Sequence, residues 1–323
     1  MKQLFKSRRG KIAFGIVVVL ILVVAVFIYG ADRGFTLGID STKSSTQDLN
    51  LGDAAQTQAV FAKLARTESE FNSLGYETMY IKSDDGLNLT GYFIPAKTKS
   101  NKLAILAHGF SMTAKNTGDL AAYFHSQGFN VFAADARAHG ESEGRYRGMG
   151  WLDRKDYLKW IDVLINKLGN DTQIVLEGTS MGGATVMMIS GEELPGNVKA
   201  IIEDCGYTSV KDIFSHQIQQ QMPFFPSFPT VDISSIECRI RAGYSYEEAS
   251  AFEQVKKSKT PIFFIHGDKD TFVPPEMVYE LYNAAQCDKE VWVVPGAEHG
   301  KSYDVAKEEY QQRIREFYSK YIH

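Results

Sequence analysis

The sequence predicts an α/β fold built on a mostly parallel central sheet, preceded by one membrane-spanning helix. From about residue 76 onward, short apolar runs alternate with helical patterns, which is the order of a sheet covered by helices. The first two runs are joined by Asp85-Gly86, a pair typical of a hairpin turn. Near the N-terminus, residues 12–31 form an uninterrupted uncharged stretch rich in Val, Ile, Leu and Phe.

The composition is that of a globular protein with a large core. Of the 323 residues, 44% are hydrophobic and 23% are charged. The formal net charge is −4, and the first eleven residues are basic, so the rest of the chain is acidic. An acidic body argues against a nucleic-acid-binding protein, which needs basic groups for the phosphates. Cys205, Cys238 and Cys287 are odd in number and far apart, so they predict neither a disulfide framework nor a zinc site.

Residues 12–31 are predicted to be a membrane anchor. A helix of this length reaches about 30 Å, the thickness of the hydrocarbon core. The stretch ends in Phe27-Ile28-Tyr29-Gly30-Ala31, without a clean small-residue cleavage pattern, although a cleaved signal peptide is the alternative. Because the basic residues 1–11 precede the span, we expect them to stay in the cytoplasm and the rest of the chain to lie outside it.

A linker and a lead helix, together residues 32–75, are predicted between the anchor and the main domain. Residues 32–51 are polar and rich in Ser, Thr and Gly, as linkers are. Apolar residues then recur at helical spacing over 53–74, and Gly75 ends this helix.

The main domain, residues 76–323, contains the predicted sheet and a small inserted cap. The predicted strands are 77–82, 88–94, 103–107, 129–134, 173–177, 198–203, 261–265 and 290–294. The predicted helices are 117–127, 151–168, 181–193, 275–286 and 302–320. Residues 207–255 lack a strong strand, so we predict that they form the cap. Its aromatic run Phe224–Pro229 is compatible with an acyl pocket, a membrane contact or ordinary packing of the cap on the body.

The motif G-x-S-x-G, which marks a nucleophilic serine on a sharp turn between a strand and a helix, occurs twice. It surrounds Ser142 and Ser180. Ser180 follows a predicted strand and opens a predicted helix, which is the setting that the motif requires. Ser142 instead lies in a glycine-rich loop between two glutamates, whose charge would oppose a developing oxyanion. We therefore predict that Ser180 is the nucleophile.

A serine nucleophile needs a base and an acid that orients the base, and in this topology both follow it in the chain. His299 lies in the loop after the last predicted strand and is the predicted base. Asp268 and Asp270 follow the preceding strand; we predict that Asp270 is the acid and that Asp268 forms the turn. His266, at the end of that strand, is expected to bond to the backbone. His216, in the cap, and the C-terminal His323 are poorly placed for catalysis.

Two backbone amides are predicted to form the oxyanion hole. One belongs to Met181, directly after the nucleophile, and the other to Phe110, in the loop His108-Gly109-Phe110 after the third strand. No H-E-x-x-H motif or related spacing occurs, so we expect neither a metal nor another cofactor.

The order of these motifs resembles that of α/β-hydrolases, in the serine-aminopeptidase and lysophospholipase-like subset that includes many membrane-anchored bacterial enzymes. The residues that carry the resemblance are Ser83–Gly86, His108–Phe110, Asp135–Ser142, Gly178–Gly183, His266–Pro274 and Glu298–Gly300. It covers roughly residues 76–323 and implies an α/β-hydrolase fold. It also implies that Asp135–Gly144, with its second G-x-S-x-G, is a structural loop. The acid of the family is the second aspartate of H-G-x-x-D, which here is Asp270.

The function expected from these residues is that of a serine hydrolase acting on an ester, thioester or amide through an acyl-enzyme. A carboxylesterase or lipase-like esterase is the first expectation, and an aminopeptidase-like serine peptidase is the second. The substrate is expected to be a small-molecule or lipid-like acyl compound. A tethered binding protein without turnover is the alternative of another class, and the intact Ser, Asp and His in family order argue against it. The oligomeric state stays open.

Overall fold

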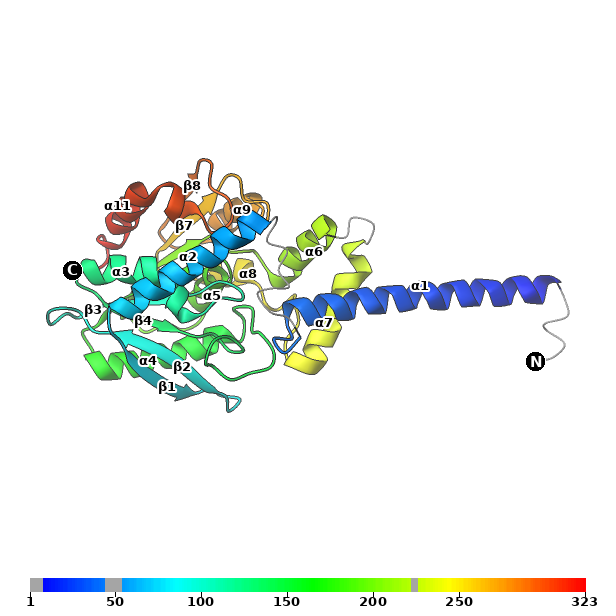
Figure 1. Ribbon diagram of the computed structural model, residues 1–323, viewed down its shortest axis with the longest axis horizontal. Helices are drawn as coiled ribbons and strands as arrows, with labels where there is room; N and C mark the ends of the chain where they lie inside the picture. The colour runs from blue at the N-terminus through cyan, green and yellow to red at the C-terminus, as the bar shows by residue number, and fades with distance from the viewer. Residues whose placement is uncertain (1–7, 44–53, 222–225) are drawn as a thin grey trace.

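The computed structural model describes residues 8–43, 54–221 and 226–323, in which a long N-terminal helix projects from an α/β body (Figure 1). The sheet of the body has the strand order β1-β2-β4-β3-β5-β6-β7-β8. β2 runs antiparallel to β1 and β4, and the other neighbouring pairs are parallel. The strands are β1 (Glu77–Lys82), β2 (Asn88–Ile94), β3 (Lys102–Ala107), β4 (Asn130–Ala134), β5 (Gln173–Thr179), β6 (Val198–Asp204), β7 (Ile262–Gly267) and β8 (Lys289–Val294). The predicted mostly parallel sheet is confirmed.

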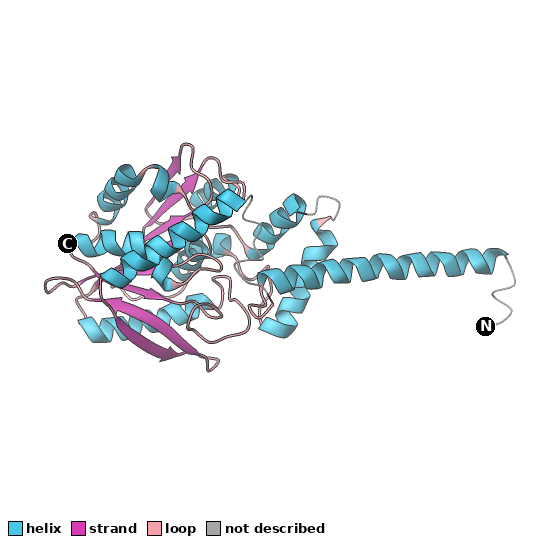
Figure 2. Ribbon diagram, viewed as in Figure 1, coloured by secondary structure: helices cyan, strands magenta, loops and turns pink. Residues whose placement is uncertain are grey.

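Helices cover both faces of the sheet (Figure 2). One face is packed by α4 (Asp153–Leu168), α5 (Met181–Ser190), α8 (Ala251–Val255) and α9 (Glu276–Ala284). The other face is packed by α2 (Ala54–Ser73), α3 (Gly118–Ser126) and α11 (Lys307–Tyr318). Large side chains such as Trp160 on the first face and Phe124 on the second are fully buried. Their burial removes apolar surface from water on both sides, which stabilises the sheet between them.

The C-terminal helix differs from its prediction, because 302–320 is interrupted. α10 (Ser302–Val305) and α11 are separated at Ala306, whose backbone is non-helical, with φ −132° and ψ 46°. Buried Ser302 donates a hydrogen bond of 2.8 Å to Asp204 Oδ1 at the end of β6. The break lets Ser302 reach this carboxylate while α11 still packs on the sheet.

Residues 207–255 form helices between β6 and β7. They are α6 (Val210–Gln221), α7 (Ser227–Ala242) and α8. α8 packs on α5 of the body, whereas α6 and α7 pack on one another and lie beside the end of α1 (Figure 1). Within the aromatic run Phe224–Pro229, Phe224 and Phe225 lie outside the described residues, and the side chain of Phe228 is 73% exposed.

α1 (Arg8–Gly38) is the one helix of the described residues that is long and apolar enough to cross a membrane. The helix continues seven residues beyond the apolar stretch, so residues 32–38 are helical where the sequence predicts linker. The reason is tertiary: Phe35 and Ile39 are fully buried in the core of the body. The rest of the predicted linker, from residue 44, lies outside the described residues.

An ion-pair cluster fixes the chain just after α1. Asp40 is buried and accepts a hydrogen bond of 2.9 Å from Arg145 Nη2, while Arg241 Nη2 of α7 lies 3.5 Å from the same carboxylate. Arg241 also lies over the Phe35 ring, 4.5 Å from its centroid. A backbone bridge joins Asp40 to Tyr146. The end of the apolar helix is therefore part of the folded body and not a loose tether.

Phe35→Ala should lower the free energy of unfolding by about 3–5 kcal/mol, because it leaves a cavity where a buried ring stood. Leu37→Ala, two residues further on the same helix and 38% exposed, is the matched control and should cost about 0.5 kcal/mol or less. Chemical unfolding of the full chain in detergent measures both. Equal losses for the two variants would show that the end of α1 does not pack as described.

Candidate active site

Ser180 stands on a sharp turn between β5 and α5. Its φ of 59° and ψ of −118° are strained for a residue with a side chain. Glycines on either side make the turn possible: a Cβ on Gly178 would lie 2.2 Å from Gly182 O, and one on Gly182 would lie 1.9 Å from Ala107 O. This turn presents the serine at the carboxyl end of the sheet.

Three of the predicted site residues meet at this edge. Ser180 Oγ lies 2.8 Å from His299 Nε2, and His299 Nδ1 lies 2.7 Å from Asp270 Oδ2. Asp270 is in the loop after β7 and His299 in the loop after β8. Because β5, β7 and β8 run parallel, their carboxyl ends bring the three loops to one edge.

The carboxylate of Asp270 is buried and fully hydrogen-bonded. Its Oδ1 accepts bonds of 2.9 Å from the backbone N–H groups of Phe272 and Val273. Burial alone would raise the pKa of Asp270, but hydrogen bonds from His266 and His299 outweigh it and hold the pKa below its ordinary value. Asp270 is therefore ionised and can accept the Nδ1–H of His299.

Asp268 has a different environment. It is exposed, and its Oδ1 accepts a hydrogen bond of 2.6 Å from the backbone N–H of Gly296. This bond fastens the turn that leads from β8 toward His299. The structure thus brings Asp270, and not Asp268, to His299.

His266 contacts the acid as well as the backbone. Its Nε2 lies 2.9 Å from Val273 O, a backbone bond of the expected kind, but also 3.3 Å from Asp270 Oδ2. Burial would lower the pKa of His266, yet the hydrogen bond to Asp270 outweighs burial and raises the pKa. The sequence predicts only the backbone bond of His266 and not its contact with Asp270. The four-residue spacing between the two residues is the only sequence feature that could have indicated this contact.

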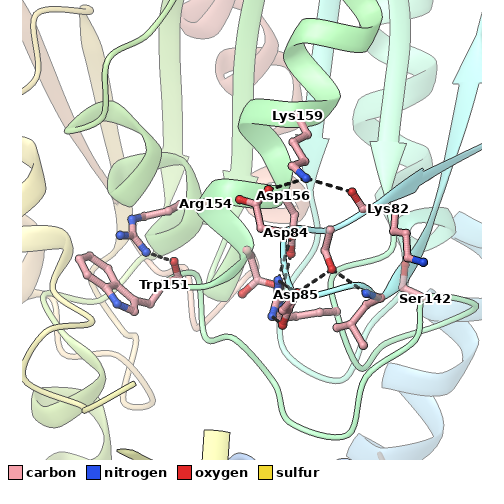
Figure 3. Close-up of polar contacts among 12 residues, drawn as sticks. Lys82, Asp84, Asp85, Ser142, Trp151, Arg154, Asp156 and Lys159 are labelled. Carbon is pink, nitrogen blue, oxygen red and sulfur yellow. Dashed lines mark hydrogen bonds and ion pairs between the residues drawn. The ribbon is translucent and has the colours of Figure 1, made fainter. Parts of the chain in front are cut away.

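The loop that contains Ser142 is held by a polar network (Figure 3). Ser142 Oγ donates to Asp135 O at 2.7 Å and accepts from Thr90 N at 2.9 Å. In the same loop, buried Arg137 lies 2.9 Å from both Asp85 and Asp156. The Ser142 hydroxyl is thus engaged with backbone groups, as expected of a structural loop.

Two buried histidines, whose role sequence reasoning missed, position the loop after β3. His108 Nε2 accepts from Ala136 N at 2.9 Å, and His139 Nε2 accepts from Ser111 N at 3.3 Å. Burial lowers the pKa of both imidazoles, and in His139 the positive charge of Arg147 lowers it further. Both rings are therefore neutral, which lets them accept these bonds.

The loop after β3 passes directly beside the nucleophile. A Cβ on Gly109 would lie 3.6 Å from the Cβ of Ser180. The backbone of Phe110, whose amide is one predicted oxyanion donor, directly follows Gly109 and therefore lies near Ser180. Met181, the other predicted donor, is the first residue of α5. Amides at the first turn of a helix point outward without an intrahelical partner, so they are suited to bind an anion.

One cluster of possible metal ligands occurs among the described residues, at Cys205, Asp270 and His299, with ligand atoms within 4.8 Å of one another. Two of the three are the hydrogen-bonded pair described above. Burial raises the pKa of the Cys205 thiol, and the thiolate is the form that binds metals. The donor set therefore fits a hydrogen-bonded acid and base better than a metal.

Buried carboxyl groups lie beneath the site, on the strands that carry it. Glu177 of β5 and Glu203 of β6 are fully buried, and burial raises the pKa of each. For Glu203 the pKa rises to about 8. A glutamate inside an otherwise apolar strand indicates a buried carboxyl group. The sequence analysis made no prediction for Glu177 or Glu203 from this pattern.

Comparison with known proteins gives a consistent result. A model of the prolyl oligopeptidase family matches residues 117–323. The uncharacterized protein YqkD of Bacillus subtilis is 26% identical over 247 residues, covering 76% of this chain and 80% of that protein. An uncharacterized membrane protein of Saccharomyces cerevisiae is 22% identical, covering 75% and 79%.

Among solved structures, an esterase of Pyrococcus furiosus is similar with a TM-score of 0.64 and 23% identity, covering 78% of this chain and 94% of that one. This likeness shows the fold, which is that of an α/β-hydrolase. The fold implied by the sequence motifs is thus confirmed.

Asp270→Asn should reduce kcat by on the order of 10⁴ in a folded protein, because an amide can present N–H to His299 and favour the wrong tautomer. Asp268→Asn, the matched variant two residues away, should mainly lower stability, by about 1 kcal/mol, since it weakens a turn bond. Hydrolysis of p-nitrophenyl acetate and thermal unfolding measure the two effects. A larger loss of kcat at Asp268 would transfer the role of the acid to that residue.

Glu203→Gln should change how stability depends on pH. The folded-state pKa of Glu203, about 8, lies above the unfolded value, so wild-type stability falls as pH rises between about 4.5 and 8. Glutamine does not titrate. The free energy of unfolding of the variant should therefore rise relative to that of the wild type as the pH increases, by up to about 1.4 kcal/mol per pH unit. Chemical unfolding at pH 5, 6.5 and 8 measures this, with exposed Glu193→Gln as control. A difference that does not vary with pH would contradict a neutral buried Glu203.

Proposed function

Because the chain belongs to the prolyl oligopeptidase family, we propose that it is a serine hydrolase that cleaves an ester, thioester or amide bond through an acyl-enzyme. The observation that carries the proposal is the continuous line from Ser180 Oγ through His299 to the Asp270 carboxylate, with distances of 2.8 and 2.7 Å. Hydrogen bonds of this length lie within the range required of a nucleophile, its base and an orienting acid.

In the first half-reaction, Ser180 Oγ attacks the carbonyl carbon and its proton moves to His299 Nε2. The ionised Asp270 accepts Nδ1–H, holds the ring in the required tautomer and stabilises the imidazolium. The amides of Phe110 and Met181 receive the oxyanion. Collapse breaks the bond to the leaving group, which takes the proton from His299. In the second half-reaction, water gives a proton to His299 Nε2 and attacks the carbonyl carbon of the acyl-enzyme. The bond from that carbon to Ser180 Oγ then breaks, Ser180 Oγ takes the proton from His299, and the carboxylic acid leaves.

Among serine hydrolases, a carboxylesterase or lipase-like esterase is our first choice for this chain. The Phe272 ring, 40% exposed, packs against the His299 ring with centroids 4.8 Å apart, so an apolar surface adjoins the reacting atoms. Such a surface suits a small-molecule or lipid-like acyl group. A serine peptidase of the same mechanism is the second choice, supported by the membership of the chain in the prolyl oligopeptidase family. Rates on p-nitrophenyl esters of increasing chain length and on aminoacyl p-nitroanilides separate the two.

We also propose that α1 spans a membrane and that the hydrolase body lies outside the cytoplasm. The basic residues before the span support this orientation. Alkaline phosphatase fused after residue 60 should then be active in a bacterial host. Activity of a reporter that works only in the cytoplasm, fused at the same point, would contradict the proposed orientation and place the hydrolase body in the cytoplasm.

The acyl-enzyme proposal predicts that a fluorophosphonate labels the full chain and that Ser180→Ala abolishes labelling. Ser142→Ala, the matched variant in the other G-x-S-x-G motif, should retain labelling in the folded fraction. Gel fluorescence together with thermal unfolding measures both. Loss of labelling from folded Ser142→Ala, with labelling kept in Ser180→Ala, would refute the assignment. A wild-type chain that does not label would favour a binding protein without turnover.

A further inference from the structure

An apolar stripe runs along the outer face of α7. Pro229, Ile233, Ile236 and Ile240 follow one another at intervals of four, three and four residues, which places them on one side of the helix. Ile236 is 62% exposed and Ile240 is 78% exposed. The opposite side of α7 is buried, and its Val231 belongs to the same core cluster as Phe35 of α1. Contiguous exposed apolar side chains are uncommon on water-facing surfaces. We therefore expect another apolar surface to cover this stripe.

The position of α7 relative to α1 indicates what that partner is. α7 crosses α1 near the C-terminal end of the long helix (Figure 1). A Cβ on Gly34 of α1 would lie 3.8 Å from Ser234 Oγ of α7, and Arg241 of α7 lies 3.8 Å from Asp32. These contacts come directly after Ala31, where the apolar stretch ends. If α1 spans a bilayer, α7 lies at the level where the span leaves the hydrocarbon.

Charged side chains flank the stripe in the manner of an interfacial helix. Asp232 and Arg239 lie on one side of it, and Glu237 and Arg241 on the other, by their positions around the helix. The side chain of Arg239 is 65% exposed. An apolar stripe between charged borders is the pattern of a helix that lies in the plane of a membrane surface, with its apolar side among the acyl chains.

We propose that α7 lies in the interfacial region of the lipid bilayer, with Ile233, Ile236 and Ile240 directed into it. This inference rests on the proposed membrane span of α1 and is independent of the hydrolytic activity. The body is then seated on the membrane by two elements, the span and the isoleucine face of α7. Burial of each isoleucine stabilises this position through the apolar surface removed from water.

The loop that contains Asp270 is connected to α7 through α6. α6, which packs on α7, is hydrogen-bonded to that loop: His216 Nε2 lies 2.9 Å from Thr271 O, and Gln217 Nε2 donates to Phe272 O at 2.7 Å. Thr271 and Phe272 directly follow Asp270. A cap helix thus joins the interfacial helix to the loop that orients His299.

Spin-label accessibility in vesicles tests the proposal. The full chain, with Cys287→Ser to remove the partly exposed native thiol, is reconstituted in phosphatidylethanolamine and phosphatidylglycerol vesicles. A nitroxide is attached at Ile240→Cys, Ile236→Cys or the matched control Arg239→Cys, and its collisions with oxygen and with a water-soluble nickel chelate are compared. Labels at 240 and 236 should favour oxygen, whereas the label at 239 should lie nearer to the aqueous phase.

Two reference labels make the outcomes distinct. Val19→Cys, in the middle of the apolar stretch, should favour oxygen most, and Tyr80→Cys, 69% exposed on β1, should favour the nickel chelate. A label at 240 as accessible to nickel as that at Tyr80, while Val19 favours oxygen, overturns the proposal. Exclusion of both reagents with spin–spin broadening would show a second copy of the chain on α7 and also overturn it. Fluorophosphonate labelling of the same samples reports the hydrolase function separately.

Discussion

The Asp270 carboxylate is the group on which the geometry of the site depends. Its two oxygens receive hydrogen bonds from the backbone of its own loop, from His299 and from His266. Burying an ionised carboxylate costs free energy unless hydrogen bonds replace its hydration. The hydrogen bonds from these partners therefore stabilise the negative charge of Asp270. With Asp270 ionised, His299 must donate from Nδ1, and only then can Nε2 accept the proton of Ser180.

The architecture explains how side chains from distant parts of the chain reach this carboxylate. Parallel strands end at one edge, and the loops after β5, β7 and β8 therefore converge there. Neutral His108 and His139 fix the loop that passes Ser180, while α6 of the cap holds the loop after Asp270. Because α1 packs into the same cap through buried Phe35, the site and the apolar helix belong to one packed unit.

The sheet and the main site residues were predictable because their signals are local. Each strand is a short apolar run, and Ser180 carries its own strand–turn–helix motif. Other features depend on tertiary contacts that no local pattern encodes. α1 extends past its apolar stretch because Phe35 finds a core, and Asp40 pairs with Arg145, 105 residues away. Likewise, the contact of His266 with Asp270 depends on how the loop after β7 folds back.

The most direct measurement of the central claim is the proton NMR spectrum of the Nδ1–H between His299 and Asp270. A proton held between a neutral imidazole and an ionised, buried carboxylate resonates far downfield of ordinary amides. The account predicts this signal in the wild type and in Ser180→Ala, and its loss in Asp270→Asn and His299→Gln. A signal that persists in folded Asp270→Asn, or that disappears only in Asp268→Asn, would contradict the account.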